Sequence, residues 1–187
     1  MNKLWILFTI LLISCEGDQF VRYRINGLDL LPIQAATAEP QVLTTEYCDV
    51  DVFGLRFDLM SEETKRKGRY FDYYESGVTC DNPIKKLKIY SNIEFDSSHP
   101  AGSSLNEYFY YFPGDYTQIE GVLNDSLPPY ITAKYMPDYE KQNFPKHADF
   151  LLIKRPANNS NRKFFARIEL SDGIVHIDST TTLNLAP

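Results

Sequence analysis

The chain has 187 residues, of which 43% are hydrophobic and 24% charged, and its formal net charge at pH 7 is −6. That length is enough for one domain with a sizeable buried core. The acidic balance, without a sustained basic stripe, argues against a nucleic-acid-binding protein.

The N-terminal segment has the organisation of an export signal. Lys3 supplies a basic start, Leu4 to Ile13 form an apolar run, and Ser14 is a small residue directly before Cys15. The run is too short to cross a bilayer, which takes about 20 residues. The apolar run and Cys15 resemble the lipobox of bacterial lipoproteins, in which the cysteine thiol receives a diacylglycerol. The resemblance implies that residues 1–14 are removed as a signal peptide and that Cys15 is lipidated.

A short polar tether follows the cysteine. With Cys15 it occupies residues 15–19, and it contains Glu16 and Asp18. Acidic residues directly behind the lipidated cysteine resemble the surface-export signals of Bacteroidetes lipoproteins. We expect residues 20–187 to form a single domain.

The first half of that domain is predicted to form strands, because apolar residues recur at alternate positions. The predicted strands are 20–25, 50–59, 69–74 and 87–95. Gly27 and Pro32 predict a surface loop over residues 26–41. Within the second strand the apolar face changes at Gly54, which predicts a β-bulge. A polar connection is expected at residues 61–69.

Two short helices are expected in a helical insertion around residues 104–124. Ser104 and Glu107 have the spacing of a capping box, and the apolar residues that follow recur at helical spacing. These are Leu105, Tyr108, Phe109 and Phe112. Thr117 and Glu120 repeat the capping signature, although Gly121 weakens the second helix.

The first predicted helix carries the candidate binding surface. If its apolar residues face the core, Tyr110 and Tyr111 lie on the opposite side, with Tyr116 nearby. Exposed aromatic side chains often mark surfaces that bind protein or sugar. The alternative is that further strands cover both faces of this helix.

The last third returns to strands, at residues 150–154, 163–170 and 180–185. Between them Asp172-Gly173 predicts a two-residue type I′ turn. That turn would pair residues of two kinds, apolar inside and polar outside: Leu170 with Val175, Ile168 with Ile177, Glu169 with His176, and Arg167 with Asp178. The strands and the helical insertion predict a mainly β protein, an antiparallel β-sandwich of Ig-like type.

The cysteine count suggests one disulfide bond. With Cys15 lipidated, Cys48 and Cys80 remain as a possible pair, which could stay oxidised outside the cytoplasm. Closing that loop would stabilise the fold by about 3–4 kcal/mol in the chain-entropy model. The alternative is two buried free thiols, because spacing alone does not show proximity.

No catalytic or metal motif stands out, and no cofactor is expected. Asp49 and Asp51 share one face of a strand end, where a calcium site or simply two solvated acids could account for them. The three histidines lack the spacing of metal ligands: His99, His147 and His176. The basic cluster at residues 65–69 is interpreted as a solubilising loop, with contact to anionic glycans or lipid phosphates as the alternative.

The lipobox, the β-rich body and the Ser171-Asp172-Gly173 hairpin together resemble Bacteroidetes lipoproteins with a single Ig-like β-sandwich domain. The resemblance implies an outer-membrane lipoprotein, periplasmic or surface-facing, held to the membrane by its lipid. Ser126, between Asp125 and Leu127, resembles the acceptor of Bacteroidetes O-glycosylation.

Three functions follow as hypotheses. The first is a non-catalytic binding module for an envelope protein or glycan. The second is a glycan hydrolase that uses two carboxylates. The third is a structural envelope protein without a soluble ligand.

Overall fold

The computed structural model describes residues 20–36, 40–49, 51, 53–67, 77–112, 147–158 and 160–186. Within these ranges the chain is mainly β-strand, with a short 3₁₀ helix at Asn106–Tyr108, and most strand pairs are antiparallel. The predicted mainly β, antiparallel fold is therefore confirmed. Several predictions concern residues outside the described ranges: the lipidation of Cys15, the strand at residues 69–74, Tyr116, Ser126 and the second helix.

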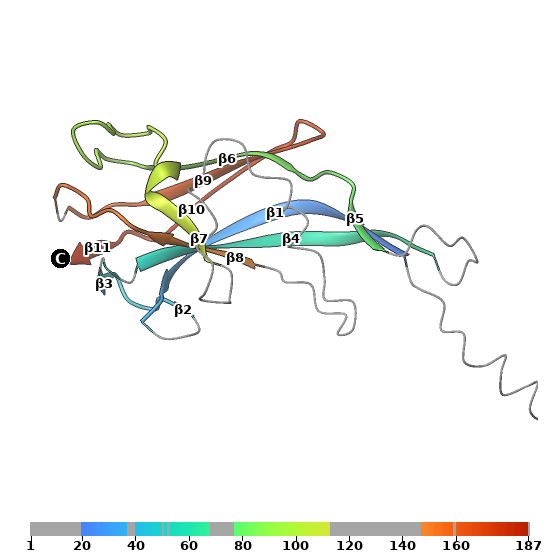
Figure 1. Cartoon of the computed structure of the whole chain (residues 1–187), viewed down its shortest axis with the longest axis horizontal. Helices are drawn as coiled ribbons and strands as arrows, with labels where there is room; N and C mark the ends of the chain where they lie inside the picture. The colour runs from blue at the N-terminus through green and yellow to red at the C-terminus, as the bar shows by residue number, and fades with distance from the viewer. Residues whose placement is uncertain are drawn as a thin grey trace, which may run out of the picture.

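The larger sheet is built around two long strands, β1 and β4, in the order β2-β1-β4-β8-β7, with β5 parallel to the start of β1 (Figure 1). Its strands are β1 (Phe20–Gln34), β2 (Gln41–Val42), β4 (Phe53–Lys67), β5 (Gly77–Cys80), β7 (Phe109–Phe112) and β8 (His147–Leu152). A short parallel pair, β3 (Tyr47–Asp49) with β11 (Asn184–Ala186), lies at the end of the molecule that holds the C-terminus.

β1 and β4 correct three expectations. The predicted loop over residues 26–41 is largely strand, because β1 absorbs Gly27 at a shift of register and continues through Pro32. The predicted polar connection at residues 61–69 is strand as far as Lys67. Gly54 does not mark a bulge. A Cβ there would lie 2.6 Å from the Phe150 carbonyl oxygen, so glycine permits the close approach of β4 and β8.

The smaller sheet has three strands in the order β10-β9-β6: β6 (Ile84–Ser91), β9 (Phe164–Leu170) and β10 (Val175–Ser179). The strands expected at 87–95 and 163–170 are confirmed as β6 and β9, with shifted ends. Alternate residues of β9 are fully buried, as strict alternation predicts.

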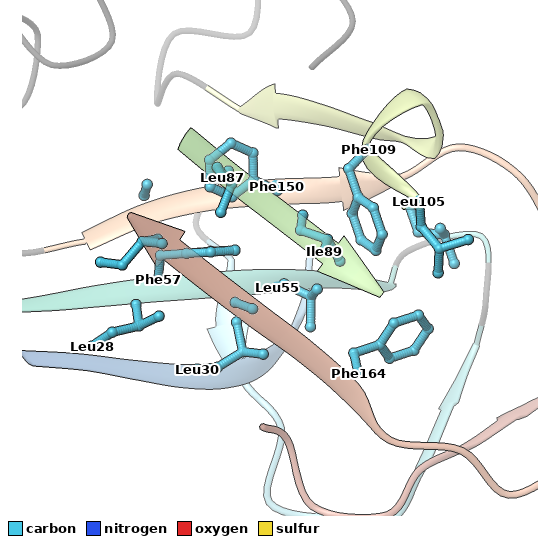
Figure 2. Close-up of a cluster of buried hydrophobic side chains, with 14 of the residues drawn as sticks. Leu28, Leu30, Leu55, Phe57, Leu87, Ile89, Leu105, Phe109, Phe150 and Phe164 are labelled. Carbon is cyan, nitrogen blue, oxygen red and sulfur yellow. The ribbon is translucent and has the colours of Figure 1, made fainter. Parts of the chain in front are cut away.

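The core lies between the two sheets. Figure 2 shows leucine, isoleucine and phenylalanine side chains from both sheets meeting there, among them Leu30, Leu55, Ile89 and Phe164. The rings of Phe53 and Phe164 join the sheets directly, with centroids 5.2 Å apart. Burial of this apolar surface on both inner faces is what holds the layers together.

The helix expected after Ser104 is not formed. The 3₁₀ helix η2 spans only Asn106–Tyr108, and strand β7 follows at once. Leu105 and Phe109 are buried as expected, but a turn and a strand bury them. The Ser104 hydroxyl accepts a long bond from the Asn106 amide, and the Glu107 carboxylate bonds His99 instead of completing a capping box.

The β9–β10 hairpin differs from the prediction by one residue. Its loop has three residues, Ser171 to Gly173, because the Leu170 amide bonds the Ile174 carbonyl and Gly173 adopts a φ of +86°. As a result Val175 lies opposite Glu169, and Ile177 lies opposite Arg167. A shift of one residue exchanges the two faces of a strand, so the predicted pairing is wrong and the faces of β10 are reversed.

Candidate functional site

The reversed register of β10 creates a mixed outer face on the three-stranded sheet. Three rows of residues cross it from β10 through β9 to β6: Val175, Glu169 and Lys86; Ile177, Arg167 and Lys88; Ser179, Phe165 and Tyr90. These nine residues are called the outer face below. The other side of the same strands carries buried residues such as Leu87, Ile89 and Ile168.

Aliphatic side chains form the β10 column of this face. The exposed fraction is 39% for Val175 and 56% for Ile177, and Ile174 at the hairpin end is 45% exposed. Of the seven large hydrophobic side chains exposed in the described ranges, this hairpin carries these three. Clustered exposed apolar groups are the kind of surface that marks an interaction site.

Aromatic and charged groups form the other two columns. The rings of Tyr90 and Phe165 stack with centroids 5.1 Å apart and planes 12° apart, and the Lys88 ammonium lies 5.4 Å from the centre of the Tyr90 ring. Glu169 is shared by Lys86 at 3.4 Å and Arg167 at 3.6 Å. The stack covers one face of each ring, which leaves less ring surface for a sugar to stack on.

The outer face is basic on an acidic protein. It holds three cations, Lys86, Lys88 and Arg167, against one anion, Glu169, whereas the whole chain carries −6. An anionic partner would therefore be attracted to this face and repelled by much of the remaining surface.

The edges of the three-stranded sheet are occupied by side chains. On the β6 side, the Asn106 amide oxygen accepts from the Ile89 amide and its nitrogen donates to the Leu87 carbonyl, both at 2.8 Å. On the β10 side, the strand lies beside β1, and the Asp178 carboxylate accepts from the Leu30 amide at 2.7 Å. A partner therefore meets this sheet through its outer face more readily than by adding a strand.

A second group of polar side chains comes together where the 95–108 segment meets the end of β8. We call it the polar cluster: Asp96, His99, Glu107, Tyr108 and Lys154. The Asp96 carboxylate accepts from Lys154 at 2.8 Å, from the Tyr108 hydroxyl at 2.9 Å and faces His99 Nδ1 at 2.9 Å. His99 Nε2 lies 2.8 Å from Glu107 Oε1.

The polar cluster fastens the connection between the two sheets to β8. Hydrogen bonds from Lys154 and His99 hold the pKa of Asp96 well below its usual range, and Asp96 in turn raises the pKa of Lys154. The acid and base groups of the cluster bond one another, an arrangement typical of a structural clamp. The sequence shows His99 without the spacing of a metal ligand and does not predict this cluster. Its position three residues after Asp96 is the feature of the sequence that could have indicated the contact between them.

The helix on which the predicted tyrosine surface depends is replaced by strand β7. Tyr110 lies in strand β7 opposite Leu151 and is half-buried, so the helical argument that placed it outward with Tyr111 does not hold. Tyr111 belongs to the same strand, but its side chain is outside the described part of the structure.

The predicted disulfide is also corrected. Cys48 and Cys80 are free thiols, the first in β3 and the second at the end of β5. Figure 1 shows these two strands well apart along the long axis, which is why no bond joins them.

The two acids considered as a calcium site have structural partners. Asp51 forms a bidentate pair with Arg155, and the Asp51 amide bonds Asp49 Oδ1 at 3.0 Å. Across the described ranges no group of three or more His, Cys, Asp or Glu residues could hold a metal ion. His176 lies opposite Ile168, and its side chain is half-buried with no hydrogen-bond partner at Nε2, whereas His147 is exposed at the start of β8.

Comparison with known proteins finds no matching family model, no matching curated protein and no matching solved structure. Among the residues that the structure describes, no helix is long and apolar enough to cross a membrane.

Proposed function

We propose that this protein is an exported lipoprotein of the bacterial outer membrane, anchored through Cys15, that acts as a non-catalytic binding module for a constituent of the envelope. The anchoring is supported by the apolar run and the small residue before Cys15. The binding role is supported by the outer face of the three-stranded sheet.

The outer face carries the proposal because it combines exposed Ile177 and Val175 with cations and a stacked aromatic pair. Such a mixture of apolar, aromatic and cationic groups is typical of contact surfaces. In the polar cluster, by contrast, the carboxylates and the histidine bond one another or Lys154. The chemistry of the described residues therefore favours binding over hydrolysis.

The anchoring half is tested in cells. An inhibitor of type II signal peptidase should accumulate the longer precursor, and Cys15→Ser should move the protein out of the detergent-soluble membrane fraction. Mass spectrometry of the N-terminal peptide should show the acyl mass on Cys15. Unchanged processing with the inhibitor, or an unmodified Cys15, would overturn the proposal.

The binding half is tested by photo-crosslinking. A photoreactive amino acid at position 177 should form adducts in intact cells, whereas the same group in place of Val42 should not. Val42 is a matched control because it is 40% exposed but lies on β2 of the other sheet. Equal adduct formation at both positions would mean that the outer face has no special partner.

A further inference from the structure

The arrangement of groups on the outer face suits a membrane surface. Val175 and Ile177 stand on one strand, and the cations stand on the next two. Neighbouring strands lie about 4.8 Å apart, so apolar and cationic columns are separated by about 5–10 Å. On a membrane, aliphatic groups enter the boundary of the acyl chains while lysine and arginine bind lipid phosphates.

The hairpin loop also lies near the start of β1, the strand that follows the predicted tether in the sequence. Arg24, near the start of β1, faces Asp172 of the hairpin loop at 3.9 Å, and Ser171 bonds the carbonyl of Pro83 at 2.9 Å. Figure 1 shows the loop that joins β9 and β10 extending away from the C-terminus. The five steps from Cys15 to Phe20, where β1 begins, can span at most about 17 Å, so an anchored domain keeps the start of β1, and with it the hairpin loop, close to the bilayer.

We infer that the outer face is a second membrane contact, which docks the domain on anionic lipid headgroups beside its anchor. The inference rests on the proposed anchoring at Cys15, which keeps the membrane at a high effective concentration. Charge complementarity selects an anionic surface, and the exposed aliphatic groups select a lipid surface over a purely polar glycan.

The test uses the full-length chain with Cys15→Ser, so that no acyl chain contributes, in flotation with vesicles. Vesicles of phosphatidylethanolamine with phosphatidylglycerol should carry the protein upward, and neutral phosphatidylcholine vesicles should carry less. Added salt should weaken the binding because it screens the charges. All variants keep residues 1–14, so any contribution of the apolar run is common to them.

Two double variants test the two halves of the face. Lys88→Glu with Arg167→Glu should reduce binding to the anionic vesicles by about tenfold or more. Val175→Thr with Ile177→Thr keeps β-branched residues in the strand and should reduce binding several-fold. Arg155→Glu and Val42→Thr make the same kinds of change at single exposed positions elsewhere, and they should bind as the parent does.

Equal binding by the face variants and their controls would overturn the inference. So would binding to a soluble acidic polysaccharide with no binding to the anionic vesicles, which would assign the face to a glycan. The outcome is separate from that of the anchoring test: an unmodified Cys15 in cells defeats the proposed function, whereas the vesicle assay does not depend on the lipid.

Discussion

At the scale of single residues, two buried asparagines bond backbone groups at strand edges, as a neighbouring strand would. Asn106 is 3% exposed and bonds both the Ile89 amide and the Leu87 carbonyl on the open edge of β6. Asn82 bonds both backbone groups of Ile25 in the same way on β1. A buried backbone group without a partner costs about 1–3 kcal/mol, so each amide protects two such groups.

Asn106→Ala should therefore lower the free energy of unfolding by about 2–4 kcal/mol. Urea denaturation measures the loss. Asn92 is the matched control, because its amide oxygen also accepts a backbone bond, from Lys163 at 2.7 Å, but at an exposed position. Asn92→Ala should cost about 1 kcal/mol or less. Equal losses would show that burial of the bonded edge is not what makes Asn106 important.

We expect Asp96 to make the stability of the fold sensitive to acid. Lys154 and then His99 hold its pKa well below the usual value in the folded protein. A depressed carboxyl pKa contributes stability that is present above the unfolded value of about 3.9 and is lost as pH falls toward the folded value. The parent protein should lose stability below about pH 5, and Asp96→Asn should lose less over the same range.

Urea midpoints measured at successive pH values check this prediction. Lys154→Met should flatten the acid dependence as well, because it removes the first cause of the depressed Asp96 pKa. Profiles as steep as that of the parent in both variants would show that Asp96 does not govern the acid response.

At the scale of elements, the register of the β9–β10 hairpin decides which isoleucines form the core. Ile177 is 56% exposed, whereas Ile168 on β9 is fully buried. Ile177→Thr should change the free energy of unfolding by at most about 0.5 kcal/mol, whereas Ile168→Ala should cost about 2–5 kcal/mol. Chemical denaturation distinguishes the two. A large loss of unfolding free energy from Ile177→Thr would show that Ile177 is buried, as the register of a two-residue turn predicts.

The sequence predicts strands best where one face of the strand is buried and the other is exposed to solvent. β6 and β9 follow from strict alternation of apolar residues, because that period belongs only to strands. Asp172-Gly173 predicts where the hairpin turns, but the loop length depends on the backbone conformation of each loop residue, and in this loop Gly173 has a φ of +86°. The Ig-like assignment stays a prediction.

Other elements depend on contacts between distant residues. β1 passes Gly27 and Pro32 because β4 pairs with it along its whole length, which local preferences do not show. The apolar spacing after Ser104 fits a helix equally well, yet pairing with β8 makes residues 109–112 a strand. The outer face followed from the corrected register, and the polar cluster unites residues up to 58 positions apart, Asp96 and Lys154.

At the scale of the whole molecule, packing and hydrogen bonds hold the described part of the sandwich together, without a cross-link between Cys48 and Cys80. Burial, helped by Asp49, raises the pKa of the Cys48 thiol to about 11, and burial also raises the pKa of Cys80. The thiolate is the reactive form, so both groups should react slowly with a thiol reagent in the folded protein at neutral pH.

Protein purified without reductant should therefore yield thiols at both Cys48 and Cys80 once it is unfolded, as mass spectrometry of alkylated peptides would show. Dithiothreitol should leave the thermal midpoint unchanged, because there is no loop closure for it to release. The contrary result would be a thermal midpoint that falls on reduction and cysteines that resist alkylation until they are reduced. It would show that Cys48 and Cys80 are bonded, which requires β3 and β5 to lie close together. The separation of the two strands is thus a test of the whole arrangement of the sheets.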